Sequence, residues 1–286
     1  MTDLAKSIRA KLLNISKAEN ISFQLIIIRY FQERLLFRLS KSGYKNVFCL
    51  KGGVLLYLFN EFKSRPTMDI DFLATNTKNE TQNLKVIFSE ICKIPFENDA
   101  VLFDYHNIDA AEIIKQGNYS GIRLNLTGKL DTIVQRIQID IGFGDKVYPK
   151  PILVNYPVIL EMEQPEINVY SIYSAIAEKF EAMIQLSEAN SRMKDFYDIY
   201  TLLSNNKIDK SELERAIELT FDTRKTQITD NHSVFQDHFY TNSDRLLQWK
   251  AFKKKAKIIE NIEFETVMIM LKTELEPIYK RLKTEP

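Results

Sequence analysis

The sequence has few cysteines, and it contains no long uninterrupted apolar run. Its two cysteines, Cys49 and Cys92, lie in apolar surroundings, which excludes a disulfide framework and a cysteine-based metal site and favours reduced structural thiols. The most apolar run, residues 25–28, is interrupted by Arg29, so we expect neither a signal peptide nor a membrane span. These absences predict a cytoplasmic protein.

The chain also lacks an excess of either charge. Lys and Arg number 39 and Asp and Glu number 38, so no global basic field indicates nucleic-acid binding, and any RNA contact must come from a local patch. The histidines, His106, His232 and His238, show no metal-ligand spacing and no partnered nucleophile. With 286 residues, of which 45% are hydrophobic, the chain is long enough for one large domain or two closely packed domains.

Hydrophobic patterning predicts an α/β architecture in the first part of the chain. The expected elements are helices at 3–18, 21–39, 54–59 and 81–93 and strands at 47–50, 69–72, 101–105, 120–127 and 136–141. Residues 128–131 are expected to form a turn, and Gly142 and Gly144 are expected to end the last strand. Prolines 149, 151, 157 and 165 mark a looped crossing out of the sheet.

From residue 171 the pattern is helical and shows no convincing strand. Helices are expected at 172–186, 192–203, 211–219, 244–255 and 264–282, the third with Ser211 as its N-cap. The sequence therefore predicts an α+β domain at 1–170, with an N-terminal helical cover on a mixed sheet, and a helical bundle at 171–286.

A glycine turn stands at the centre of the first domain. The strand at 47–50 enters Gly52 and Gly53, and an apolar helix follows. A strand that turns on glycines into a helix presents free backbone N–H groups where a phosphate could sit. Without further evidence, two glycines before a helix more often indicate only a tight turn than a phosphate-binding site.

Two acids follow on the next strand. Asp69 and Asp71 are two residues apart and share one face, whereas Ile70 and Phe72 point into the core. Two close carboxylates disfavour each other unless they lie in water or around a cation such as Mg²⁺. For an isolated pair of this kind a solvated strand face is the better interpretation.

A third acid changes that balance. Asp140 lies on the polar face of a half-buried strand in which isoleucines alternate with polar residues. Three carboxylates on two strands beside a glycine turn are the constellation needed to hold Mg²⁺ against a triphosphate.

The pattern of these residues resembles that of the nucleotidyltransferase superfold. Their exact sequence motifs resemble those of the AbiEii branch, the toxins of bacterial toxin–antitoxin and abortive-infection systems. The motifs that carry the resemblance are Leu50-Lys51-Gly52-Gly53 and Arg65-x-Thr67-x-Asp69-x-Asp71, followed by the lone strand residue Asp140. The resemblance implies that Lys51, Gly52, Gly53, Arg65 and Thr67 contribute to nucleotide binding.

The helical part carries two further blocks of this resemblance. Lys179, followed by Arg192-x-Lys194-Asp195-x-x-Asp198, looks like the third and fourth AbiEii motifs. The resemblance implies that Lys179 contacts the triphosphate or base, that Asp195 with Asp198 orients Lys179 or assists deprotonation of the acceptor, and that Arg192 and Lys194 meet phosphate. Without the resemblance, the spacing on one helical face would indicate a surface ion-pair ladder.

The resemblance implies a nucleotidyltransferase that uses one or two Mg²⁺ ions and an NTP, with a tRNA 3′ end as the acceptor and a cognate antitoxin as partner. One departure is Val54, where the family commonly has a small hydroxyl residue. Two alternatives stay open: a nucleotide-binding module without turnover, and transfer to a small molecule or protein. Outside the matched blocks, the lysines of 250–257 beside Trp249 and Phe252 form a candidate RNA patch, for which a solvated amphipathic face is the simpler interpretation.

Overall fold

The computed structural model describes residues 3–60, 64–115, 119–258 and 260–283. The chain forms two compact units, which we call unit 1 (Met1–Gly144 with Pro151–Val169) and unit 2 (Asp145–Lys150 with Tyr170–Pro286). Within the described residues, no helix has the length and apolar character that crossing a membrane requires.

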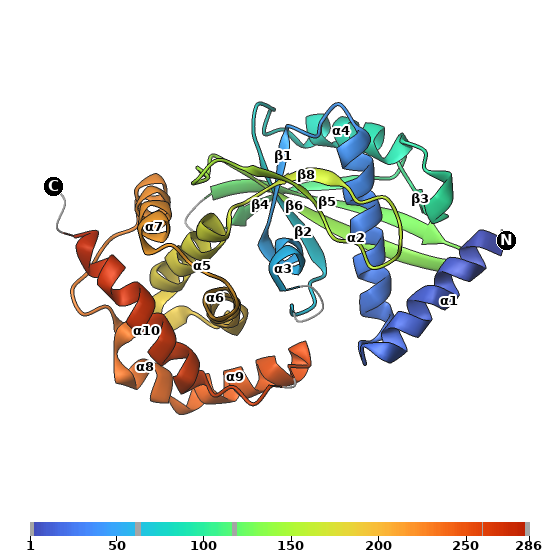
Figure 1. The fold of residues 1–286 in the computed structure, drawn as a ribbon. Coiled ribbons are helices and arrows are strands. Elements are labelled where there is room, and N and C mark those ends of the chain that lie inside the picture. The colour runs from blue at the N-terminus through green and yellow to red at the C-terminus, as the bar shows by residue number, and fades with distance from the viewer. Residues whose placement is uncertain (1–2, 61–63, 116–118, 259, 284–286) are drawn as a thin grey trace. The chain divides into compact units, whose positions relative to one another are not determined.

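Unit 1 is built on a mixed sheet, as predicted (Figure 1). Its strands are β1 (Phe48–Lys51), β2 (Asp69–Ala74), β3 (Leu102–Phe103), β4 (Asp109–Lys115), β5 (Tyr119–Leu130), β6 (Ile133–Phe143), β7 (Ile152–Asn155) and β8 (Glu166–Val169). Their order is β3-β5-β6-β2-β1-β8-β7, and β4 also pairs with β5. The pairs β2–β6 and β1–β8 are parallel and the others are antiparallel.

Helices flank this sheet. They are α1 (Asp3–Ala18), α2 (Phe23–Lys41), α3 (Gly52–Asn60) and α4 (Thr81–Lys93), with a short 3-10 helix at Glu97–Asp99. α2 passes over the sheet (Figure 1). It starts after Ser22, whose hydroxyl accepts a hydrogen bond from the N–H of Leu25. Every residue of α2 from Ile26 to Leu39 is buried, so this helix is surrounded on all sides by its own unit.

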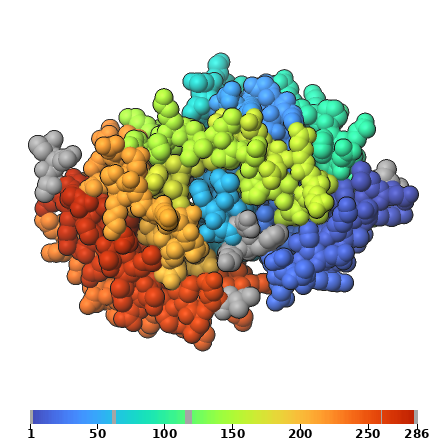
Figure 2. Space-filling model, viewed as in Figure 1, coloured from blue at the N-terminus to red at the C-terminus, as the bar shows by residue number. Residues whose placement is uncertain are grey.

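Two ion pairs anchor charged residues of α2 inside unit 1. Arg38 Nη1 donates to Asp99 Oδ2 at 2.7 Å, and Arg29 Nε donates to Glu33 Oε1 at 2.9 Å. Burial raises the pKa of Glu33. The charge of Arg29 and the hydrogen bond from the N–H of Ile159 act in the opposite direction and lower it. In Figure 2, yellow-green atoms of the segment after β7 lie beside blue atoms of the N-terminal helices. These contacts fix α2, which covers the sheet, in one position.

The turn predicted at 128–131 is wrong, because β5 continues through Gly128 to Leu130 and the chain reverses at 131–132. A Cβ on Gly128 would lie 2.6 Å from the ring of Phe31 on α2, so this glycine permits close helix–sheet packing instead of a turn. Gly142 likewise does not end β6, since it pairs with Leu73 and Gly121.

Three short strands escaped prediction, and one was overestimated. β4 was not predicted, and the segment expected to be a looped crossing contains β7 and β8. The strand expected at 101–105 is reduced to Leu102–Phe103. β7 and β8 have only four residues each, too few to show a period, and the seven residues of β4 show no apolar–polar alternation, so pairing within the sheet decides all three.

Unit 2 is helical, and its described residues contain no strand, as predicted. Its helices are α5 (Ile172–Leu186), α6 (Met193–Asn205), α7 (Lys210–Arg224), α8 (Asp237–Thr241), α9 (Ser243–Ala256) and α10 (Phe264–Arg281), with 3-10 turns at Ser187–Ala189 and Ser233–Phe235. The predicted N-cap Ser211 is wrong: Asp209 caps α7 and accepts from the N–H groups of Ser211 and Glu212 at 2.8 and 3.2 Å.

Candidate functional site

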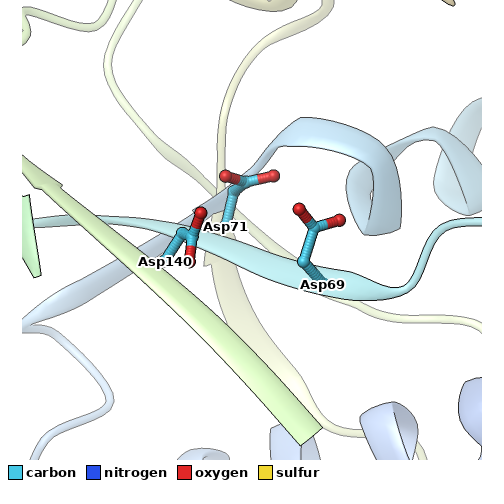
Figure 3. Close-up of side chains that lie close together, drawn as sticks. All are labelled: Asp69, Asp71 and Asp140. Atoms are coloured by element: carbon cyan, nitrogen blue, oxygen red, sulfur yellow. The ribbon is translucent and has the colours of Figure 1, made fainter. Parts of the chain in front are cut away.

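Three carboxylates meet on one face of the sheet in unit 1. β2 and β6 run parallel with Asp71 directly opposite Asp140, and Asp69 lies two residues before Asp71 on the same face. As predicted, Ile70 and Phe72 are buried. Each acid offers one oxygen, and these oxygens all lie within 4.8 Å of one another (Figure 3). The structure thus brings the three predicted acids together.

The chemistry of this cluster fits a small divalent cation. Carboxylates at this spacing repel one another unless a positive charge lies among them. Mg²⁺ prefers oxygen ligands, and the cluster supplies three carboxylates of which Asp69 and Asp71 are only half-buried. Asp69, Asp71 and Asp140 are therefore the residues that would hold such an ion.

Arg123 on β5 is a charged neighbour of the acid cluster that the sequence did not predict. Its Nε and Nη2 each donate to one oxygen of Asp140, both at 2.8 Å. These hydrogen bonds are the largest cause of a raised pKa for Arg123, and the charges of Asp140, Asp69 and Asp71 add to it against the effect of burial. The alternation of residues 120–127 placed Arg123 on the polar face, but only the register of β5 on β6 sets it opposite Asp140.

The glycine turn is built around the acids. Gly52 has φ +67°, a left-handed conformation, and a Cβ on it would lie 2.1 Å from Asp71 Oδ2. A Cβ on Gly53 would lie 2.5 Å from Thr67 Oγ1. Both glycines thus allow the start of α3 to approach the acid-bearing strand, and Lys51 directly precedes them opposite Asp71.

The loop before β2 contributes two of the predicted residues. The buried Thr67 donates from Oγ1 to Asp69 Oδ1 at 2.9 Å, so it orients the first acid. Arg65 is half-buried, and its Nη1 lies 3.5 Å from the carbonyl of Pro66.

Val54, the departure from the family pattern, belongs to the core. Its side chain is 1% exposed, and its carbonyl accepts a hydrogen bond from the hydroxyl of Tyr156 at 2.8 Å. The position therefore serves the packing of α3 in unit 1.

A second charged cluster lies within unit 2. Lys179 on α5 donates from Nζ to Asp198 Oδ2 at 2.7 Å and to Asp195 Oδ1 at 3.3 Å, and both acids lie on α6. Asp195 and Asp198 are fully buried. The spacing that could have indicated a surface ladder instead makes a buried network that holds one lysine.

The predicted basic residues of this block lie at the start of α6. Arg192 precedes the helix, and its Nε lies 2.8 Å from Asp195 Oδ2, an ion-pair distance without alignment for a hydrogen bond. Lys194 lies in the first turn and is half-buried. The structure therefore joins Arg192, Asp195, Asp198 and Lys179 in one network.

The candidate RNA patch loses Trp249, whereas its other aromatic residue, Phe252, is half-buried. Trp249 is 2% exposed, packs against Tyr197 and Phe264, and donates from Nε1 to the carbonyl of Ile262 at 2.9 Å. It is a core residue of unit 2. Exposed lysines remain on this part of α9 and just beyond it: Lys250, Lys254, Lys255 and Lys257.

Comparison with solved structures shows the same fold elsewhere. JHP933 from Helicobacter pylori matches with a TM-score of 0.53 at 15% identity, covering 92% of this chain and 95% of that protein. A second H. pylori protein, described as a candidate nucleotidyltransferase, matches with a TM-score of 0.50 at 14% identity, covering 92% of this chain and 98% of that one. None of the curated proteins matches the chain.

A family model gives the assignment that these distant structures cannot give. The model for the nucleotidyl transferase AbiEii toxin of type IV toxin–antitoxin systems matches residues 34–268. This range contains the acid cluster, the glycine turn and the Lys179 network. The chain therefore belongs to the AbiEii family of nucleotidyltransferase toxins.

Proposed function

We propose that this protein is a Mg²⁺-dependent nucleotidyltransferase that transfers a nucleoside monophosphate from an NTP to an acceptor hydroxyl. The observation that carries the proposal is the convergence of Asp69, Asp71 and Asp140 within 4.8 Å beside a glycine turn. Asp69 and Asp71 would hold a first ion, and Asp140 would complete the position of a second one. One or two Mg²⁺ ions bound there would supply stabilisation of charge on the attacking and leaving oxygens.

The reaction is an in-line substitution at the α-phosphorus. The acceptor oxygen forms a bond to that phosphorus, the bond to the α–β bridging oxygen breaks, and pyrophosphate leaves. The acceptor hydroxyl gives up its proton, for which the carboxylates of the acid cluster are acceptors. The chain contributes mainly by positioning the reactants and by neutralising charge.

The triphosphate would lie against the glycine turn. The start of α3 offers backbone N–H groups at a helix N-terminus, and Lys51 and Arg65 add positive charge on either side of it in sequence. Thr67 keeps Asp69 oriented through its 2.9 Å hydrogen bond. These residues therefore bind and orient the nucleotide without taking part in bond making.

We propose that unit 2 contributes Lys179 and Asp195 to the same reaction. An ammonium is a compact charge suited to a phosphate, and two buried acids hold this one in place. Asp195 is fully buried between Lys179 and Arg192, which favours an orienting role over proton transfer from the acceptor. Arg192, Lys194 and Asp198 complete this part of the nucleotide site.

The acceptor that we propose is the 3′ end of a tRNA, so that transfer would arrest translation in the cytoplasm. Family membership supports a toxin function and a cognate antitoxin. The exposed lysines of α9 are a surface on which an RNA backbone could rest, although the chain carries a net charge of only +1.

The test is incubation of the protein with α-labelled NTPs, Mg²⁺ and total tRNA. We expect label on tRNA from one or more of the four nucleotides, and a loss of roughly 100-fold or more in Asp69→Ala with Asp71→Ala. Asp109→Ala, which removes an exposed strand carboxylate outside the cluster, is the matched control and should keep full activity.

Other outcomes separate the alternatives. NTP binding without pyrophosphate release would indicate a nucleotide-binding module. Label on a small molecule or a protein, abolished by the same aspartate substitutions, would keep the chemistry and change the acceptor.

A further inference from the structure

The acid cluster lies in a row of four charged residues across four adjacent strands. Lys51 on β1 is opposite Asp71 on β2, Asp71 is opposite Asp140 on β6, and Asp140 is opposite Arg123 on β5. Directly paired residues project on the same face of a sheet. The row therefore places two acids between two bases.

Arg123 binds both carboxylate oxygens of Asp140 in this arrangement. Its Nε donates to Oδ1 and its Nη2 to Oδ2, both at 2.8 Å, which is the fork geometry of a strong arginine–carboxylate pair. Gln138 lies beside the pair: with its amide oxygen turned towards the guanidinium, it accepts from Nε and Nη2 at 3.2 and 3.3 Å. Arg123 is thus held by two neighbours on β6.

The two partners differ in their freedom to move. The Asp140 side chain is 8% exposed, whereas the Arg123 side chain is 40% exposed. Asp140 is fixed beside Asp71, but the long arginine side chain can turn towards solvent without opening the core. Any exchange of cations at Asp140 would therefore move the arginine and leave the carboxylate in place.

We propose that Arg123 is the internal counterion of the acid cluster and competes with a divalent cation for Asp140. This inference rests on the proposed function, because it concerns the same metal position. In the metal-free protein Arg123 neutralises part of the charge of the three acids. When Asp140 binds a divalent ion, Arg123 loses its hydrogen bond to at least one of the two carboxylate oxygens of Asp140, since two cations at one carboxylate repel each other. Arg123 is a positioning residue that sets the affinity of the metal position.

The test is the affinity of the full chain for Mn²⁺ alone, measured by isothermal titration calorimetry without nucleotide. For Arg123→Gln we expect binding tighter by roughly threefold to tenfold, the range set by removal of one half-exposed ion pair. The midpoint of thermal unfolding should fall in EDTA, and the rise on adding Mn²⁺ should be larger than in the wild type, because the acids have lost their own cation.

Arg136→Gln is the matched control. Arg136 lies on the same face of β6, four residues before Asp140, and its Nε donates to Asn125 Oδ1 at 3.2 Å. This variant also loses one positive charge, but at about 13 Å along the strand it should leave Mn²⁺ affinity unchanged.

Unchanged or weaker Mn²⁺ binding in Arg123→Gln would overturn the proposal, and weaker binding would show that Arg123 only aligns Asp140 for the ion. Failure of the proposed function gives a different result. In that case the wild type would bind no Mn²⁺, or its Mn²⁺ binding would be unchanged by the double substitution Asp69→Asn with Asp71→Asn.

Discussion

Gly52→Ala should damage the acid cluster and also lower the stability of the protein. A residue other than glycine at φ +67° costs about 1–2 kcal/mol. The new Cβ would lie 2.1 Å from Asp71 Oδ2 and 2.7 Å from both Asp71 Cβ and Cγ, so rotation of the carboxylate alone cannot remove the overlap. Overpacking of this kind costs about 1–3 kcal/mol, which brings the expected loss in unfolding free energy to about 2–5 kcal/mol. Displacement of Asp71 should also weaken Mn²⁺ binding and abolish nucleotidyl transfer.

The assay compares urea unfolding, Mn²⁺ binding and label transfer for Gly52→Ala with those for Gly43→Ala. Gly43 has no atom within 4 Å of its would-be Cβ and no positive φ, so alanine there should be neutral or slightly stabilising. If Gly52→Ala keeps the stability, metal affinity and activity of the Gly43→Ala protein, the turn is not built around close approach to Asp71.

Three further outcomes follow from contacts outside the acid cluster. Arg38→Met should cost about 3–5 kcal/mol in urea unfolding, because Asp99 would stay buried without its partner, whereas Lys41→Met at an exposed pair should cost about 1 kcal/mol or less. Burial lowers the pKa of His232 below its ordinary 6.5, so the unfolded chain binds more protons and unfolding free energy should fall as pH drops below about 6.5. His232→Asn should flatten that dependence in denaturation curves taken from pH 7.5 to 5, and an unchanged slope would contradict it. Trp249→Ala should cost about 3–5 kcal/mol and leave the tRNA affinity of the folded protein unchanged in filter binding, so a selective loss of RNA binding would show that the aromatic ring is a contact.

The acids were predictable because their signal is local. Two residues on one strand share a face by geometry alone, and Ile70 and Phe72 fix which face that is. The long helices were predictable for the same reason, since α2 and α10 carry several turns of apolar periodicity.

The Arg123–Asp140 pair was not predictable, because it depends on the register of a hairpin. The chain reverses at 131–132, and this sets Arg123 opposite Asp140. A turn centred on 128–131, as the glycine suggested, would shift the pairing by four residues and place Arg123 opposite Arg136. Gly128 led to the wrong turn prediction because it leaves space for the ring of Phe31 on α2, and this contact joins elements far apart in the sequence.

The Lys179 network shows a similar limit. Spacing three apart at the start of α6 puts Arg192, Asp195 and Asp198 near one another, but a solvated ladder and a buried network share that spacing. Packing of α5 on α6 decides between them, since it buries both acids and brings Lys179 to 2.7 Å from Asp198.

The central claim is that Asp69, Asp71 and Asp140 act as one metal-binding site, and anomalous diffraction from crystals soaked with Mn²⁺ and a non-hydrolysable NTP tests it most directly. The account predicts an anomalous peak in contact with the carboxylates of Asp69 and Asp71, with the triphosphate beside the turn at Gly52. Absence of a peak there at saturating Mn²⁺, or a peak held by other residues, would contradict it.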